Sequence, residues 1–309
     1  MERRTGRQRG CRYRLAALLL AVLAAACQPA LALPEDDRPT VLTTISILAD
    51  FGRAVAGEHL RVESLVEIGG DPHTFEPRPS DAARITEADL IVRNGLGLEH
   101  WLDQLIDDAS AQRPVATLTD GLTAARNGAA PDPHLWMDPE LASEYVDRIA
   151  EAFSELDPAH AAAYHRNAAA YQRRLARLDA EMAALLDDVP AQRRRLVTTH
   201  DAFRYFGERY GLKIVGTIWS VSTEREPSAR EISRLVDGIR AVDVPVVFVE
   251  TTINPDLMRR VAHDGGVGVG EPLYGDSVGE IGSGAESYEG MMRTNARRIQ
   301  RGLLTRSGS

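Results

Sequence analysis

Three histidines and one aspartate stand at similar places in this chain of 309 residues. His73 follows a β-rich run that ends at Ile68, and His200 ends the run RLVTTH. His134 lies just ahead of an expected helix, and Asp276 follows the last β-rich run. Because ligands collect beyond the carboxyl ends of parallel strands, these side chains are candidates for one shared site. Three imidazoles and a carboxylate suit a divalent ion such as zinc or manganese.

Each of these residues also has an ordinary structural explanation. A single loop histidine is usually a surface or hydrogen-bonded residue, and the Asp-Pro-His steps at 71–73 and 132–134 favour turns in any protein. The gaps of 61, 66 and 76 residues between successive candidates match no short metal motif. The spacing alone therefore leaves the shared site open.

From Val41 onward, β-rich runs alternate with helical patterns, which is typical of parallel α/β lobes. The expected strands are Val41–Ser46, Arg61–Ile68, Asp89–Asn94, Pro114–Leu118, Arg195–His200, Lys213–Ile218, Pro245–Glu250 and Val267–Gly270. The expected helices are Leu48–Ala56, Ser80–Ala88, Leu98–Asp107, Ala202–Tyr210, Ala229–Ala241, Asp256–His263 and Tyr288–Arg301. The two series predict two similar lobes.

A long helix is expected between the lobes, over Pro158–Asp188. It begins after Asp157, a capping acid, with a proline at its first position. Helical spacing places six large residues on one face, and at 1.5 Å per residue the helix would be about 45 Å long. These residues are Tyr164, Tyr171, Leu175, Leu178, Met182 and Leu185. A helical hairpin arm or coiled coil is the alternative, but no helix of similar length follows.

The N-terminal 32 residues are typical of a secretory signal peptide. Six arginines precede the apolar run Leu15–Ala26, which is shorter than the ~20 residues that a membrane span requires. Cleavage could follow Ala32, or Cys27 could become a lipid-modified N-terminus. The other cysteine, Cys11, also lies in this segment, so the exported chain can form no internal disulfide or cysteine metal cluster. We expect a periplasmic or otherwise extracytoplasmic protein.

These boundaries divide the chain into a signal peptide (1–32), an N-terminal α/β lobe (33–157), a connecting helix (158–188) and a C-terminal α/β lobe (189–309). The whole chain carries a formal charge of -9, and residues 33–309 hold 30 basic against 44 acidic residues. A nucleic-acid-binding protein needs a basic face, which this acidic chain does not indicate. We therefore expect no nucleic-acid partner.

Six strings occur in order around the expected long helix: DPHTFEPRPSD, NGLGLEHWL, DPHLWMDP, THDAFRYFGERYGL, FVETTINP and LYGDSVG. With them, the chain from Val41 to Leu304 resembles the solute-binding proteins of bacterial zinc and manganese ABC importers. The resemblance implies two lobes, each with a parallel four-stranded sheet flanked by helices, joined by one long rigid helix. It also implies a metal-delivering receptor, not an enzyme, that acts as a monomer with a membrane permease. The implied metal ligands are His73, His134, His200 and Asp276.

The transported ion is expected to be zinc or manganese. A histidine at position 200 makes the ligand set rich in nitrogen, which favours zinc. The stretch Asp107–Pro133 lacks the histidine-rich loop of many zinc relatives, and the strings FVETTINP and LYGDSVG resemble manganese-type relatives. The sequence leaves the choice open, with iron a further possibility.

Among the remaining residues, Glu250 is the best candidate to hold a ligating imidazole from behind, because it closes the run PVVFVE. His160 and His165 are expected to face solvent. Two rival functions are a zinc metallohydrolase, against which the absence of a HExxH string counts, and a metal-binding surface adhesin or lipoprotein.

Overall fold

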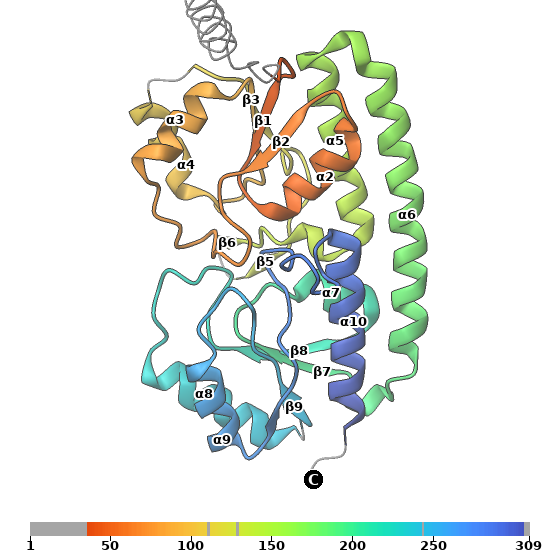
Figure 1. Ribbon diagram of the computed structural model, residues 1–309. Helices are drawn as coiled ribbons and strands as arrows, with labels where there is room; N and C mark the ends of the chain where they lie inside the picture. The colour runs from red at the N-terminus through yellow and green to blue at the C-terminus, as the bar shows by residue number, and fades with distance from the viewer. Residues whose placement is uncertain (1–35, 110–111, 128–129, 243, 306–309) are drawn as a thin grey trace, which may run out of the picture. The chain divides into compact units, whose positions relative to one another are not determined.

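The computed structural model describes residues 36–305, apart from 110–111, 128–129 and 243. The fold lies within one compact unit, Arg38–Ser309. Figure 1 shows its helices and strands. The expected signal peptide and Cys27 lie outside the described residues. Within the described part of the chain, no helix is both long and apolar enough to cross a membrane.

The first lobe is built on a four-stranded parallel sheet in the order β2-β1-β3-β4. Strands β1 and β3 lie in the middle and are almost wholly buried, as in parallel sheets covered on both faces. The strands are β1 (Thr40–Thr43), β2 (Arg61–Ser64), β3 (Leu90–Arg93) and β4 (Val115–Thr117). The intervening helices are α2 (Ser46–Ala56), α3 (Pro79–Glu87) and α4 (His100–Asp108).

The second lobe holds two parallel ladders of two strands, β7-β8 and β10-β9. The Phe248 N–H donates to the Val197 carbonyl at 2.9 Å and so links the ladders. A continuous four-stranded sheet was expected. The structure differs, because β7 and β9 are joined by this contact and not by regular strand pairing. The strands are β7 (Arg195–Thr198), β8 (Lys213–Thr217), β9 (Val246–Val247) and β10 (Gly268–Val269), and the helices are α7 (Arg204–Tyr210), α8 (Ala229–Ala241) and α9 (Asp256–Gly265). The structure confirms the α/β class with parallel sheets flanked by helices.

Two helices, α5 (Pro139–Leu156) and α10 (Tyr288–Leu304), pack against the long helix α6 (Ala161–Asp187). Figure 1 shows α6 running beside both lobes. The long helix is confirmed, although Pro158–His160 form a 3-10 turn and the α-helix begins at Ala161. As expected, no helix of similar length follows it among the described residues, but the shorter α5 precedes it and packs along it.

A continuous apolar cluster joins these three helices to both lobes. The expected stripe on α6 forms its centre: Tyr164, Tyr171, Leu175, Leu178 and Met182 are at most 2% exposed. At the end of the stripe Leu186 is buried, whereas Leu185, the expected member, is only partly so. Each large apolar side chain buried in this way contributes about 1.5–3 kcal/mol to stability.

The strands are shorter than expected because their ends bend into turns. The run RLVTTH pairs only to Thr198, whose hydroxyl then donates to the His200 carbonyl at 2.9 Å. A short antiparallel pair, β5 (Arg126–Asn127) and β6 (Ala130–Pro131), was not expected, since its sequence carries turn formers but no apolar alternation. The residues after each strand are therefore free to form the site.

Candidate metal centre

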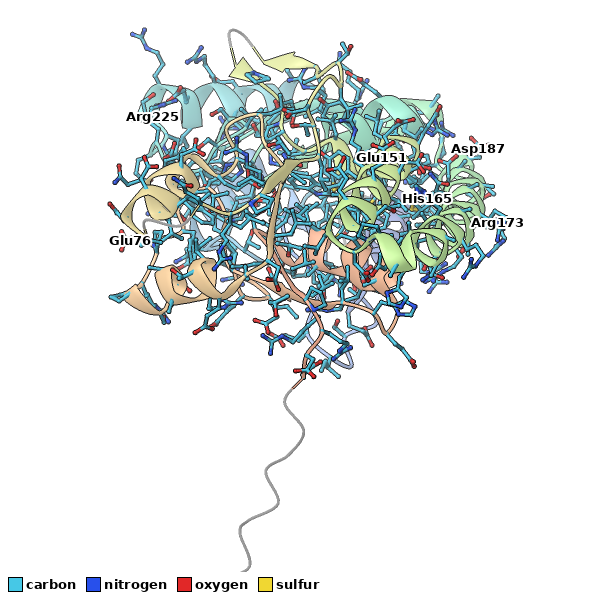
Figure 2. All side chains as sticks on the ribbon, turned by 90° about the horizontal axis from the view of Figure 1, so that it is seen from above. Glu76, Glu151, His165, Arg173, Asp187 and Arg225 are labelled. Atoms are coloured by element: carbon cyan, nitrogen blue, oxygen red, sulfur yellow. The ribbon has the colours of Figure 1, made fainter. Side chains whose placement is uncertain are left out.

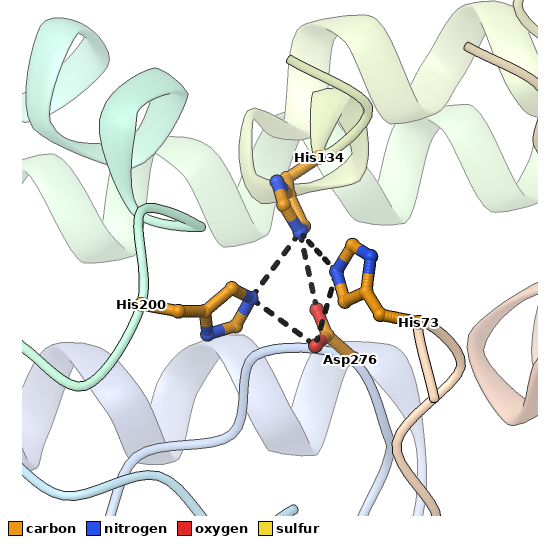
Figure 3. A group of neighbouring side chains, drawn as sticks. All are labelled: His73, His134, His200 and Asp276. Atoms are coloured by element: carbon orange, nitrogen blue, oxygen red, sulfur yellow. Dashed lines mark hydrogen bonds and ion pairs between the residues drawn. The ribbon is translucent and has the colours of Figure 1, made fainter. Parts of the chain in front are cut away.

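Four loops bring the candidate ligands together. His73 follows β2, and His134 precedes the 3-10 helix Leu135–Met137. His200 follows β7, and Asp276 follows Leu273, which bridges to Glu250 beyond β9. Figure 3 shows the four side chains converging from separate segments. The structure thus brings together all four residues that the sequence analysis singled out.

The ligand atoms of this cluster all lie within 4.8 Å of one another. The Nε2 atom of His134 lies 3.4 Å from Nε2 of His73 and 3.3 Å from Nε2 of His200. The Asp276 carboxylate lies 3.2 Å from His200 Nε2, 3.5 Å from His134 Nε2 and 3.9 Å from His73 Nε2. Tetrahedral ligands at zinc distances stand about 3.3–3.4 Å apart. The spacing of the four side chains therefore fits a single ion.

The cluster is shielded from water. His134 and His200 are 0% exposed, Asp276 is 1% and His73 is 2% exposed. Neither Asp276 oxygen has a hydrogen-bond partner of good geometry among the described residues. A buried carboxylate without such partners is costly unless a cation compensates it. A divalent ion at the centre of the four groups would supply that charge.

Burial and charge shift the ionisation of these groups in different directions. Burial lowers the pKa of His73 to about 3. Burial also acts to lower the pKa of His200, but the Glu250 and Asp276 carboxylates outweigh it and hold that pKa well above its usual value. Burial would raise the pKa of Asp276, yet the facing His200 keeps it below its usual range. These shifts favour an ionised Asp276 beside a protonated His200 in the metal-free cluster, and a cation that binds both groups must displace the proton.

The two Asp-Pro-His strings form the same local turn. Asp71 Oδ1 accepts the His73 N–H at 2.9 Å, and Asp132 Oδ1 accepts the His134 N–H at 3.0 Å. Aspartate commonly bonds to the backbone two residues further on, and this fixes the direction in which the next side chain leaves the loop. The turn-forming explanation and the ligand explanation of these strings therefore hold together.

Carboxylates hold two of the imidazoles from behind. Asp132 Oδ1 lies 2.7 Å from His134 Nδ1, and Glu250 Oε2 lies 2.7 Å from His200 Nδ1. Glu250 also accepts the His200 backbone N–H through Oε1, at 2.8 Å. A carboxylate on Nδ1 fixes the tautomer that leaves Nε2 free to bind a metal. The expected contact of Glu250 is confirmed, whereas Asp132 was missed, although its repeated Asp-Pro-His context was a usable signal.

Gly275 allows the second lobe to close around His200. A Cβ at this position would lie 2.6 Å from Glu250 Oε2 and 3.3 Å from His200 Cε1. Any side chain would therefore displace the carboxylate that holds the imidazole. Its neighbour Asp276 can enter the site only because the backbone passes this close, which explains a glycine directly before the acidic ligand candidate.

The other described histidines lie apart from the cluster. His165 is an exposed residue of α6 that lies beside α5, with its Nε2 atom 3.4 Å from Ser154 Oγ (Figure 2). His160 contacts Asp157 and stacks on His59, with ring centroids 4.0 Å apart. The His100 side chain is 52% exposed and lies 2.8 Å from Glu224. No second group of ligating side chains is found among the described residues.

Known proteins share this chain's sequence and fold. The family model described as zinc-uptake complex component A, periplasmic (ZnuA), matches residues 41–302. The manganese-binding lipoprotein MntA of Halalkalibacterium halodurans is 37% identical over 93% of this chain and 96% of its own length. The iron-binding protein YfeA of Yersinia pestis is 36% identical over 78% of this chain and 79% of its own.

Among solved structures, the periplasmic zinc-binding protein TroA of Treponema pallidum superposes with a TM-score of 0.83 and 30% identity. The match covers 87% of this chain and 100% of TroA. The family model and the relatives span both lobes and the long helix. The chain therefore belongs to the ZnuA family of periplasmic zinc-uptake components.

Proposed function

We propose that this protein captures one divalent transition metal ion, zinc or manganese, with His73, His134, His200 and Asp276, and delivers it to the membrane permease of an ABC importer. The observation that carries the proposal is the buried cluster of three Nε2 atoms and one carboxylate, within 4.8 Å of one another. Each half of the chain supplies two of the four groups. An ion held in this way joins the halves and travels as cargo.

The protein is a receptor and not an enzyme. Its family consists of substrate-binding components of ABC importers, so the metallohydrolase interpretation is wrong. The geometry agrees with this assignment. A catalytic zinc site keeps one position open for water and substrate, whereas the four groups of this cluster are each at most 2% exposed.

The donor set supports zinc, and manganese remains within the proposal. Three nitrogens and one carboxylate are common zinc ligands, while a carboxylate that offers both oxygens also suits a harder ion. The relatives are named for different metals: MntA for manganese, YfeA for iron and TroA for zinc. One fold therefore serves several ions, and the metal carried by this chain is a matter for measurement.

The protein works outside the cytoplasm, as its family description says. We further propose that it acts as a monomer and that Cys27, outside the described residues, carries a lipid anchor. The names of two relatives support the anchor, since MntA and the pneumococcal PsaA are both called lipoproteins. Cleavage after Ala32 is the alternative, and the mass of the mature N-terminus distinguishes the two.

The decisive experiment is mass spectrometry of the natively purified protein under non-denaturing conditions. We expect one zinc or manganese ion per monomer, lost when the protein is unfolded. The same spectrum gives the subunit number and the N-terminal mass. A metal-free protein that binds neither ion on titration would overturn the proposal.

A further inference from the structure

An ion can reach this cluster only if some of the surrounding protein moves, because no candidate ligand is more than 2% exposed. The polar contacts between the two halves of the chain include one set beside α10 and the shared apolar cluster and another in loops beyond β8. Further contacts join Arg204 and Tyr205 of α7 to Asp132, and Ser277 to Ser46 and Gly69. The two sets differ in burial, and this difference indicates where the site opens.

The first set is deeply buried. Trp136 Nε1 donates to the Gly275 carbonyl at 3.1 Å, and the Tyr288 hydroxyl donates to the Trp136 carbonyl at 2.7 Å. Trp136 and Tyr288 are 0% exposed and belong to the continuous apolar cluster. Separating the halves here would expose large aromatic side chains to water, which is strongly unfavourable. This side of the interface is therefore expected to stay closed.

The second set involves the segment Trp219–Glu226, which we call the strap. Its start is fixed beside a candidate ligand, because the Trp219 N–H donates to the Thr199 carbonyl and the Asp201 N–H donates to the Ser220 carbonyl. Both contacts flank His200 in the chain. The strap therefore begins at the ligand loop of the second lobe.

The far part of the strap contacts the first lobe. The Thr223 hydroxyl donates to Asp71 Oδ2 at 2.6 Å, and Glu224 Oε1 lies 2.8 Å from His100 Nε2. Asp71 is also the residue whose other oxygen accepts the His73 N–H. One carboxylate thus connects the strap to the loop of a candidate ligand. The strap spans from the His200 loop to the His73 loop.

The strap contacts are less buried than the first set, and the Thr223–Asp71 hydrogen bond is only partly buried. The side chains of His100 and Glu224 are 52% and 50% exposed, and exposed ion pairs contribute little to stability. Figure 2 places Arg225 of the strap, and Glu76 beyond His73, on the side opposite His165 of α6. The labelled strap residue and helix α6 therefore lie on opposite sides of the molecule in this view.

We propose that the strap is the gate of the metal site, held shut by the Thr223–Asp71 hydrogen bond and the Glu224–His100 contact, and that the ion enters and leaves on this side. The inference rests on the proposed function, because it assigns the route to the same four ligands. Thr223 and Glu224 touch no candidate ligand side chain. They act as positioning residues that set the rate of exchange.

The test compares metal exchange in full-chain variants, using zinc as the probe. Thr223→Val keeps the shape of the side chain but removes the donor, and we expect zinc to dissociate into excess chelator about tenfold faster, as for loss of a hydrogen bond to a charged group. Zinc entry should accelerate as well, so that affinity changes less than either rate. Glu224→Gln should have a smaller effect, because its contact is half exposed.

Arg225→Gln is the matched control. Arg225 lies in the strap, but its partner Glu231 belongs to the same lobe, so the exchange rates should not change. In an Asp71→Ala background, Thr223→Val should have no further effect on exchange, because its acceptor is already absent. Additive effects in the two backgrounds would contradict the assigned contact.

The outcomes separate the gate from the function. If Thr223→Val binds one zinc ion with unchanged exchange rates, the gate is overturned and the receptor function stands. If dissociation accelerates with an equal loss of affinity, Thr223 supports the His73 loop and the gate is again overturned. If the wild-type chain binds no zinc or manganese, the proposed function itself fails.

Discussion

The first lobe presents His73 as a neutral imidazole, whereas the second lobe presents His200 as a protonated one. Burial dominates at His73 and lowers its pKa to about 3. At His200 burial is outweighed by the Glu250 and Asp276 carboxylates, which raise the pKa. The first lobe therefore offers a ligand that is ready to bind, and the second offers one that must first release a proton. The two halves contribute equal numbers of ligands but different chemistry.

The lobes also differ in how their sheets are built. The four strands of the first lobe pair continuously, while those of the second form two ladders linked at Phe248 and Val197. A register shift between Leu196 and Val197 comes only a few residues before His200. Fewer regular hydrogen bonds support the second lobe's ligand loops. We therefore expect metal to stabilise this half more than the first.

Removing a candidate ligand should have the largest effect on binding. We expect His134→Ala to weaken zinc binding by more than about 100-fold, because even residues that merely support a ligand are worth 10–100-fold. His165→Ala, an exposed position on α6 away from the cluster, is the control and should bind as the wild type does. Isothermal titration measures both. An unchanged affinity in His134→Ala would show that the ligand assignment is wrong.

Metal should raise the stability of the folded protein, and more so in the second lobe. An ion at a thousandfold excess over Kd adds about 4 kcal/mol. The melting temperature should rise with zinc or manganese and return to its starting value with chelator. Hydrogen exchange should slow most around His200 and Asp276. Equal slowing in both lobes would contradict the comparison of their sheets.

Replacing the carboxylates that contact the Nδ1 atoms of His134 and His200 compares the two lobes one residue at a time. Asp132→Asn and Glu250→Gln should each weaken zinc binding by about 10–100-fold. Glu250→Gln should cost more, because Glu250 uses one oxygen for Nδ1 and the other for the backbone N–H of His200, so a glutamine loses one acceptor. Asp132 makes both contacts with His134 through Oδ1, which an asparagine retains. Titrating the two variants side by side is the measurement. A larger loss of zinc affinity in Asp132→Asn than in Glu250→Gln would contradict this expected order.

Proton release should be the smallest of these effects. Because the pKa of His200 is raised and that of His73 is lowered, zinc binding near neutral pH should release about one proton, from His200. Titration in buffers of different ionisation enthalpy counts it. Glu250→Gln should reduce the number, since it removes a charge that holds the proton. Release of several protons would mean that His73 is also protonated.

The same shifts give opposite effects on the stability of the metal-free fold. The raised pKa of His200 stabilises the fold below about pH 6.5, the unfolded value, and this contribution is lost as the pH rises through the folded value. The lowered pKa of His73 destabilises the fold as the pH falls from about 6.5 towards 3. Chemical unfolding of His73→Ala and His200→Ala across this range separates the two.

Much of this architecture could be predicted from periodic patterns. The apolar spacing on α6 and the capping sequence of α8 determine local structure, and helix α8 has the bounds expected, Ala229–Ala241. The break between β7 and β9 could not be predicted, because Pro245–Glu250 is as apolar as a continuous strand would be. Pairing depends on how the neighbouring backbone twists, and this leaves no mark on composition.

The site was predicted from position and resemblance, while its supporting contacts required coordinates. His73, His134, His200 and Asp276 follow strands or precede a helix, which a sequence can reveal. In both Asp-Pro-His turns the aspartate makes a further side-chain contact. Asp132 contacts the imidazole of the nearby His134, and Asp71 contacts Thr223 of the other lobe. An aspartate before proline has an ordinary role in turns, so its second role appears only when all the contacts of its carboxylate are located.

The order in which the four ligand candidates occur along the chain affects when metal can be captured. They are spread from His73 to Asp276, over most of the folded unit. A polypeptide still being synthesised or threaded through a translocation channel therefore holds an incomplete ligand set until its last part has emerged. Capture of the ion must follow completion of the chain, so a protein exported as an unfolded polypeptide would be loaded at its destination and not in the compartment where it is made.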